Sequence, residues 1–157
     1  RINGKSEIVS VTGDNPHHKY TYKDAFQRVR KLANALQGVG FNQGDRIATL
    51  AWNDYRHFEL YYAISCSGQV CHTVNPRLFP EQIEYIISHA EDTILFLEFT
   101  FVDMIEKLKD RLPSSLRYVV MTDEAHMPSS TTLSPLGNSL VVASADTRPL
   151  SNKSFSE

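Results

Sequence analysis

The chain has 157 residues, enough for one domain with a sizeable core or for one piece of a larger domain. Hydrophobic residues make up 41% and charged residues 22%, and the net charge of −2 gives no electrostatic reason to expect a nucleic acid or an anionic membrane as partner. No apolar run approaches the roughly 20 residues that span a bilayer, and we expect no secretory signal.

The first segments predict a β-hairpin followed by a helix. Residues 7–12 and 18–20 have the character of short strands around the turn residues Asp14-Asn15-Pro16. Thr21 and Asp24 then have the spacing of a capping box, which marks the start of a helix. An apolar stripe follows at helical spacing, formed by Phe26, Val29, Leu32, Ala33 and Leu36.

Between residues 45 and 123 a simple unit recurs: a short apolar run, polar residues and a helical pattern. Four apolar runs start 23 or 24 residues apart: Ile47–Trp52, Val70–Val74, Ile94–Leu97 and Tyr118–Met121. That spacing fits one strand and one covering helix each time. The runs are nearly continuous rather than alternating, as in strands buried on both faces. The sequence therefore predicts an α/β fold, a parallel sheet with covering helices in βα repeats.

The helices between these strands carry their own signals. Pro80 suits a first helical position, Thr100 and Asp103 have capping-box spacing, and Pro113 should stop the last helix. The residues expected to face inward are, in chain order, Phe58, Tyr61, Tyr62, Ile64, Ile83, Ile86, Ile87, Ala90, Val102, Ile105, Leu108 and Leu112.

Two cysteines, Cys66 and Cys71, are too few for a disulfide framework. Their small or apolar neighbours predict buried free thiols, and a cytoplasmic location is the simplest expectation. Near Pro128 the composition changes, and the 29 residues that follow include eight serines. We expect residues 1–128 to form the folded unit, and the composition of residues 129–157 predicts a disordered Ser-rich tail.

Ligands of parallel α/β sheets usually bind outside the carboxyl ends of the strands. Polar groups follow the predicted strands there: Asn53-Asp54, Asn75-Pro76-Arg77, Glu98-Phe99-Thr100 and Thr122-Asp123-Glu124. Asn53 and Thr100 fit helix capping as well as ligand binding. Arg77 is different, because a cation near a helix start opposes the helix dipole. Its side chain is expected either to be solvated or to bind an anion.

Familiar motifs are absent from the sequence. It contains no Gly-x-Gly-x-x-Gly after a strand, no Gly-x-x-x-x-Gly-Lys and no Gly-x-Ser-x-Gly. Its six histidines and two cysteines have no spacing typical of zinc ligands. The residues alone therefore assign no catalytic group and no metal ligand.

Five stretches, taken together, carry a resemblance: Tyr20-Thr21-Tyr22-Lys23-Asp24, Leu32-Ala33-Asn34-Ala35-Leu36, Gly44-Asp45-Arg46-Ile47-Ala48, His72-Thr73-Val74-Asn75-Pro76-Arg77-Leu78-Phe79-Pro80-Glu81-Gln82-Ile83 and His89-Ala90-Glu91-Asp92. With Ala51-Trp52-Asn53, they resemble the adenylate-forming (AMP-binding) superfamily, and the later ones its medium- and long-chain fatty-acyl-CoA synthetase branch. The resemblance covers roughly residues 7 to 128, so the tail is also expected not to be native to the family.

The resemblance implies an ATP-dependent fatty-acid–CoA ligase, which makes an acyl-adenylate and passes the acyl group to coenzyme A. In the family this needs a Ser/Thr/Gly-rich loop ending in Pro-Lys-Gly, a glutamate for Mg²⁺, an aspartate for the ribose and a lysine on a mobile C-terminal domain. The residues Ser129-Ser130-Thr131-Thr132 have the right types, but neither Gly nor Lys follows directly. The resemblance thus implies an N-terminal fragment that is inactive alone. ATP, Mg²⁺ and coenzyme A are cofactors of the full-length parent.

One site residue is carried over. In some relatives the arginine of the Asn-Pro-Arg segment lies near the nucleotide end of bound coenzyme A, and here it is Arg77. The partners implied for the parent are fatty acid, ATP and CoA, with a homodimer allowed. Two other hypotheses stay open. One is a non-catalytic interaction or regulatory module that keeps the parent's packing or dimer surface; the other is a flavodoxin-like nucleotide binder, whose expected phosphate loop is missing.

Overall fold

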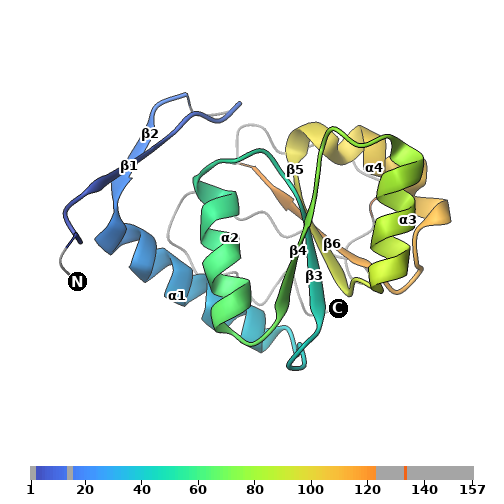
Figure 1. Ribbon diagram of the computed structural model, residues 1–157, viewed down its shortest axis with the longest axis horizontal. Helices are drawn as coiled ribbons and strands as arrows, with labels where there is room; N and C mark the ends of the chain where they lie inside the picture. Colours follow the sequence, from blue (N-terminus) through green and yellow to red (C-terminus); the bar gives the residue numbers. More distant parts are fainter. Residues whose placement is uncertain (1–2, 14–15, 123–132, 134–157) are drawn as a thin grey trace.

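The computed structural model describes residues 3–13, 16–122 and 133, which form a three-layer α/β unit with a hairpin at one side (Figure 1). The hairpin pairs strands β1 (Glu7–Ser10) and β2 (His18–Thr21). The larger sheet contains β3 (Arg46–Leu50), β4 (Val70–Val74), β5 (Ile94–Glu98) and β6 (Arg117–Met121). Helices α1 (Tyr22–Gly38) and α2 (Tyr55–Cys66) lie on one side of this sheet, and α3 (Pro80–Ala90) and α4 (Val102–Leu108) lie on the other. Single 3₁₀ turns occupy η1 (Phe99–Phe101) and η2 (Lys109–Arg111).

The four predicted strands are confirmed as one parallel sheet with the order β4-β3-β5-β6. The central strand β3 is nearly fully buried because it is covered on both faces. Ile47 joins the core beneath α1 and α2, whereas Ala48 and Leu50 join the core beneath α3 and α4. The expected burial on both faces is confirmed for β3, β5 and β6. It is wrong for β4, where only Val74 is buried, because β4 lies at one end of the strand order.

The start of α1 agrees with the prediction. The Thr21 Oγ1 accepts the N–H of Asp24 at 3.2 Å, and Asp24 Oδ2 accepts the N–H of Thr21 at 3.0 Å, which completes the capping box. This box orients the end of β2 directly into α1. The hairpin and the helix are consequently joined without a loop.

Two predicted caps are wrong. Asp54, not Asn53, caps α2, because the Asp54 Oδ1 accepts the His57 N–H at 2.9 Å. Thr100 does not cap α4, since it lies inside η1 and its hydroxyl donates to Glu98 Oε2 at 2.8 Å. In both places a nearby polar residue, Asp54 or Glu98, forms a hydrogen bond that competes with the predicted cap. The spacing of the residues alone does not tell which hydrogen bond forms.

The predicted buried face of α2 is also largely wrong. Ile64 is buried, but Phe58 is half-buried and Tyr61 and Tyr62 are exposed. The polar residues Arg56, His57 and Glu59 are buried instead. The reason is tertiary: Glu59 pairs with Arg28 of α1, Arg56 lies beside Asp54, and His57 contacts Thr49 of the sheet.

Several expectations concern residues outside the described ranges. The tail at 129–157 lies there except for Leu133, which is buried in the core beneath α3 and α4. In the described part of the chain, no helix is long and apolar enough to cross a bilayer.

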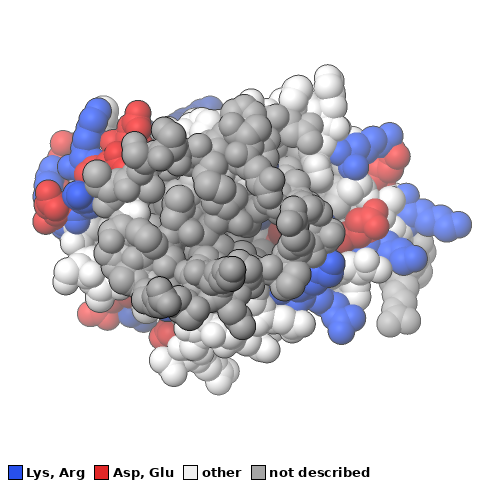
Figure 2. Space-filling model, turned by 180° about the vertical axis from the view of Figure 1, so that it is seen from behind, with Lys and Arg blue, Asp and Glu red and all other residues white. Residues whose placement is uncertain are grey.

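On the face that Figure 2 shows, lysine and arginine lie beside aspartate and glutamate at both ends, so the charges visible there are mixed rather than separated by sign.

Candidate functional site

The carboxyl edge of the sheet has a topological switch point between β3 and β5. The chain leaves β3 through α2 on one face and leaves β5 through α4 on the other, an arrangement that creates ligand crevices in α/β proteins. Here Trp52 follows β3 and its ring lies 5.3 Å from that of Phe101 after β5. The Glu98 carboxylate is buried at the same edge and bonded to Thr100. The switch point therefore offers a half-exposed aromatic surface with a buried acid beside it.

Arg77 lies at this edge in the turn after β4, as the sequence predicted. Its backbone N–H donates to Asn75 Oδ1 at 3.0 Å, and the N–H of Leu78 donates to the Asn75 carbonyl at 3.2 Å, so Asn75 shapes the turn. The Arg77 side chain is exposed, and no carboxylate among the described residues forms an ion pair with it. This cation is thus open to an anionic ligand.

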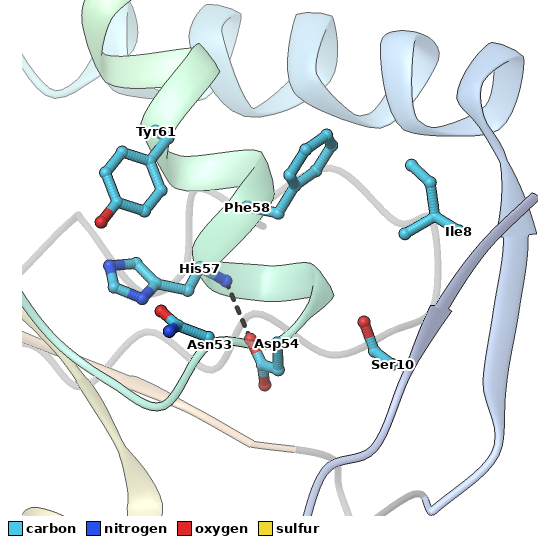
Figure 3. Close-up of a pocket in the computed structure, with 7 residues that line it drawn as sticks. All are labelled: Ile8, Ser10, Asn53, Asp54, His57, Phe58 and Tyr61. Atoms are coloured by element: carbon cyan, nitrogen blue, oxygen red, sulfur yellow. Dashed lines mark hydrogen bonds between the residues drawn. The ribbon is translucent and has the colours of Figure 1, made fainter.

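A recess of about 300 Å³ lies between the hairpin and the first turns of α2 (Figure 3). Figure 3 shows Ile8 and Ser10 on β1 across from Asp54 and Phe58. The full lining consists of Ile8, Ser10, Asn53, Asp54, His57, Phe58 and Tyr61. Its walls are mainly apolar, and they carry two hydroxyls, one amide, one carboxylate and one imidazole.

His57 is held neutral in the wall of this recess. Burial lowers the pKa of its imidazole, against the opposing effect of the nearby Asp54 carboxylate. The His57 Nε2 lies 3.0 Å from Thr49 Oγ1 on β3, and the ring stacks on Tyr61 with centroids 4.7 Å apart. These contacts anchor α2 to the sheet and fix the orientation of the ring.

Asp54 is committed to structural contacts as well. Besides capping α2, its Oδ2 lies 3.6 Å from Arg56 Nη1, and both side chains are 5% exposed. A carboxylate that caps a helix and pairs with a buried guanidinium is a poor general base, because its lone pairs are already occupied. The recess can therefore hold an apolar group with a polar tip, but its described residues supply no catalytic pair.

A polar cluster attaches the hairpin and α1 to α2. The Arg28 Nε donates to Glu59 Oε1 at 2.6 Å, with side-chain exposures of 21% and 6%. Burial raises the pKa of the Glu59 carboxyl, and the Arg28 guanidinium opposes this effect. The pKa of the Tyr20 hydroxyl is also raised, by burial and by the nearby Glu59 carboxylate. His18 of β2 stacks on Tyr55 of α2 with centroids 3.6 Å apart. The hairpin side of the recess is thus held in place through α2.

Sequence reasoning placed Arg77 at the carboxyl edge, and its contact with coenzyme A stays a prediction, but the recess was missed. Nothing in the local pattern places Ile8 and Ser10 beside residues 43 or more positions later. Asp54 could have been found, because an aspartate three residues before a helical N–H is a common N-cap. For metals, the described residues contain no group of three or more His, Cys, Asp or Glu side chains that could hold an ion.

Comparison with known proteins supplies the family. The chain matches the family model described as AMP-binding enzyme over residues 2–152. It is 46% identical over 121 residues to a medium-chain-fatty-acid–CoA ligase of Ectopseudomonas oleovorans, and 45% identical over 121 residues to a 3-methylmercaptopropionyl-CoA ligase of Ruegeria lacuscaerulensis. Each alignment covers 77% of this chain and 22% of the relative. The chain thus spans about a fifth of the length of these curated relatives.

The fold agrees with that result. A mutant form of coronafacic acid ligase from Pectobacterium brasiliense superposes with a TM-score of 0.66 and 16% identity, over 83% of this chain and 25% of the other. At that identity the match speaks for the fold alone. The parallel sheet with helices on both faces is therefore an arrangement that this ligase contains within a longer chain. Together with the family model, which matches most of the sequence, these results show that the chain belongs to the AMP-binding enzyme family.

Proposed function

We propose that the chain is the N-terminal part of an ATP-dependent fatty-acid–CoA ligase, which activates a carboxylate as an acyl-adenylate and transfers the acyl group to coenzyme A. The observation that carries the proposal is the 46% identity to a medium-chain-fatty-acid–CoA ligase over 121 residues. The parent's substrates would be a fatty acid, ATP and CoA, with Mg²⁺ neutralising the phosphates. A cytoplasmic parent stays a prediction.

The part proposed here is a scaffold rather than a catalytic centre. The sequence has no Ser/Thr/Gly-rich loop ending in Pro-Lys-Gly, and the acids at the recess and switch point already have partners. The donor groups of the described residues therefore do not fit ATP with its metal. Arg77 fits an anionic group such as a nucleotide phosphate, because it is exposed and unpaired among the described residues.

Two measurements test this proposal. The 157-residue chain alone should show no exchange of pyrophosphate into ATP with any fatty acid, and measurable exchange would refute the claim that the ATP-binding groups lie elsewhere. A chimera in which this chain replaces the matched stretch of the E. oleovorans ligase should form acyl-CoA from a medium-chain fatty acid. A chimera that folds but forms no acyl-CoA would contradict the ligase assignment.

The role of Arg77 is tested in the same chimera. Arg77→Ala should raise the KM for CoA several-fold and leave pyrophosphate exchange unchanged, because CoA enters only after the adenylate has formed. The matched control is Lys107→Ala, which removes an exposed cation on α4. Equal effects of the two substitutions on the KM for CoA would show that Arg77 has no specific contact.

A second candidate is a non-catalytic interaction module that retains the parent's packing or dimer surface. The exposed aromatic residues Tyr22, Phe26 and Tyr62 favour it, since soluble proteins rarely leave such side chains together without a partner. Sedimentation of the chain with a full-length relative distinguishes this module from an inert fragment. A module forms a complex of defined mass, whereas a fragment remains alone or aggregates.

A further inference from the structure

Exposed apolar side chains are unevenly distributed over the described residues. Ten large hydrophobic side chains are exposed, and six of them lie on or beside the hairpin, α1 and α2: Val9, Val11, Tyr22, Phe26, Tyr61 and Tyr62. Helix α3 contributes fewer, namely Phe79 at its N-cap and Tyr85. The helix pair next to the hairpin is therefore the apolar side of this molecule.

Aromatic residues of α1 and α2 adjoin one another, and three of their rings are in contact. Tyr22 and Phe26 lie four residues apart on α1, hence on one helical face, and Phe58 and Tyr62 have the same spacing on α2. The rings of Tyr22 and Phe58 are 6.4 Å apart, and those of Phe58 and Tyr62 are 5.0 Å apart. We call Tyr22, Phe26, Phe58 and Tyr62 the aromatic face. Phe58 also lines the recess, so the recess opens beside this face.

The hairpin beside it is incomplete as a sheet. Within the described residues, β1 pairs only with β2, which leaves the outer edges of both strands without a neighbouring strand. Val9 is 66% exposed and Val11 is 74% exposed. A two-stranded sheet with apolar side chains turned to solvent is typical of a surface that another segment extends and covers.

The comparisons indicate which polypeptide covers it. The chain corresponds to 22% of the curated ligases and 25% of the coronafacic acid ligase structure, so most of a family member's polypeptide lies outside it. That polypeptide must pack against this part somewhere. The sheet core is already enclosed by helices on both faces, whereas the aromatic face and the hairpin are open.

We propose that the aromatic face and the outer surface of the hairpin bind the remaining polypeptide of the full-length ligase, with the recess receiving an apolar side chain from it. This docking surface rests on the proposed function, since the partner is the rest of an AMP-binding enzyme. The aromatic face provides the apolar contact, and the open edge of the hairpin provides backbone donors and acceptors for an added strand.

Tyrosine nitration by tetranitromethane, followed by peptide mass spectrometry, tests the surface. Tyr22, Tyr62 and Tyr85 are 48%, 51% and 64% exposed and should all react in the 157-residue chain. In the chimera with the E. oleovorans ligase, Tyr22 and Tyr62 should react at least about tenfold more slowly because the partner buries them, while Tyr85 on α3 keeps its rate. Unchanged rates for Tyr22 and Tyr62 in the chimera would overturn the proposal.

A second measurement uses substitution instead of labelling. Phe26→Ser should lower the Tm of the chimera more than that of the isolated chain, whereas Phe79→Ser, at the start of α3, should act equally in both. Equal effects of Phe26→Ser in the two settings would refute the docking surface. Protection of Tyr22 that rises with concentration of the isolated chain would also refute it, because a second copy would then be the occupant.

These results separate the two proposals. A chimera that protects Tyr22 and Tyr62 but makes no acyl-CoA supports the docking surface and contradicts the ligase assignment. An active chimera with unprotected tyrosines supports the ligase and contradicts the docking surface.

Discussion

The Arg28–Glu59 pair provides the sharpest test of how the hairpin side is attached to the sheet. Replacing Glu59 by Ala removes the carboxylate that pairs with the largely buried Arg28 guanidinium. Removing one member of a buried ion pair typically costs about 3–5 kcal/mol. Because 21% of the Arg28 side chain is exposed and can reach water, we expect a loss of about 2–3 kcal/mol in the free energy of unfolding.

Urea denaturation followed by circular dichroism measures that loss. For a chain of this length the same change should lower the Tm by roughly 4–12 °C. Glu7→Ala is the matched control, since it breaks the Lys19–Glu7 pair, whose Nζ–Oε2 distance is similar at 2.7 Å but whose side chains are more than half exposed. The control should lose no more than about 0.5 kcal/mol. Equal losses in the two variants would show that burial does not strengthen the Arg28–Glu59 contact.

Two further predictions concern single positions. Glu91 has a φ of 53°, a backbone conformation that favours glycine, and its ion pair with Arg46 is largely exposed. Glu91→Gly should therefore raise the free energy of unfolding by about 0.5–1 kcal/mol in urea denaturation. Glu91→Ala keeps a Cβ and should not raise it. Burial raises the pKa of the Cys71 thiol against a hydrogen bond from Thr49, so its alkylation by iodoacetamide should reach half-maximal rate at a higher pH than that of free cysteine. A midpoint at or below that of free cysteine would contradict this burial effect.

The two thiols also show where local patterns stop being informative. Both were expected to be buried, yet Cys66 is exposed and Cys71 is half-buried. Cys66 is the last residue of α2, and Cys71 lies on β4, which pairs with a strand on one side only within the part of the chain that the structure describes. Neighbouring residues predicted the right elements for both cysteines. They did not reveal which side of each element would be covered.

The same division applies to the candidate site. The position of Arg77 was predictable because a turn after an apolar strand places it at the carboxyl edge, and the structure has it exposed there, while its role as a ligand contact stays a prediction. The recess was not found, because Ile8 on β1 and His57 on α2 meet only after the hairpin has folded back onto the helix. Contacts between segments so distant in sequence leave no trace in local periodicity.

The amino-acid sequence by itself determined the elements of this protein: the strand runs, the capping box of Thr21 and Asp24, and the parallel α/β class. These depend on backbone preferences and on apolar periodicity, which are local properties. Only the tertiary structure decided that α2 turns Glu59 inward and leaves Tyr62 exposed. A buried carboxylate is tolerable only with a partner, and its partner Arg28 lies 31 positions earlier on a different helix. Burial of polar groups is therefore settled by long-range pairing and not by the pattern of the helix that carries them.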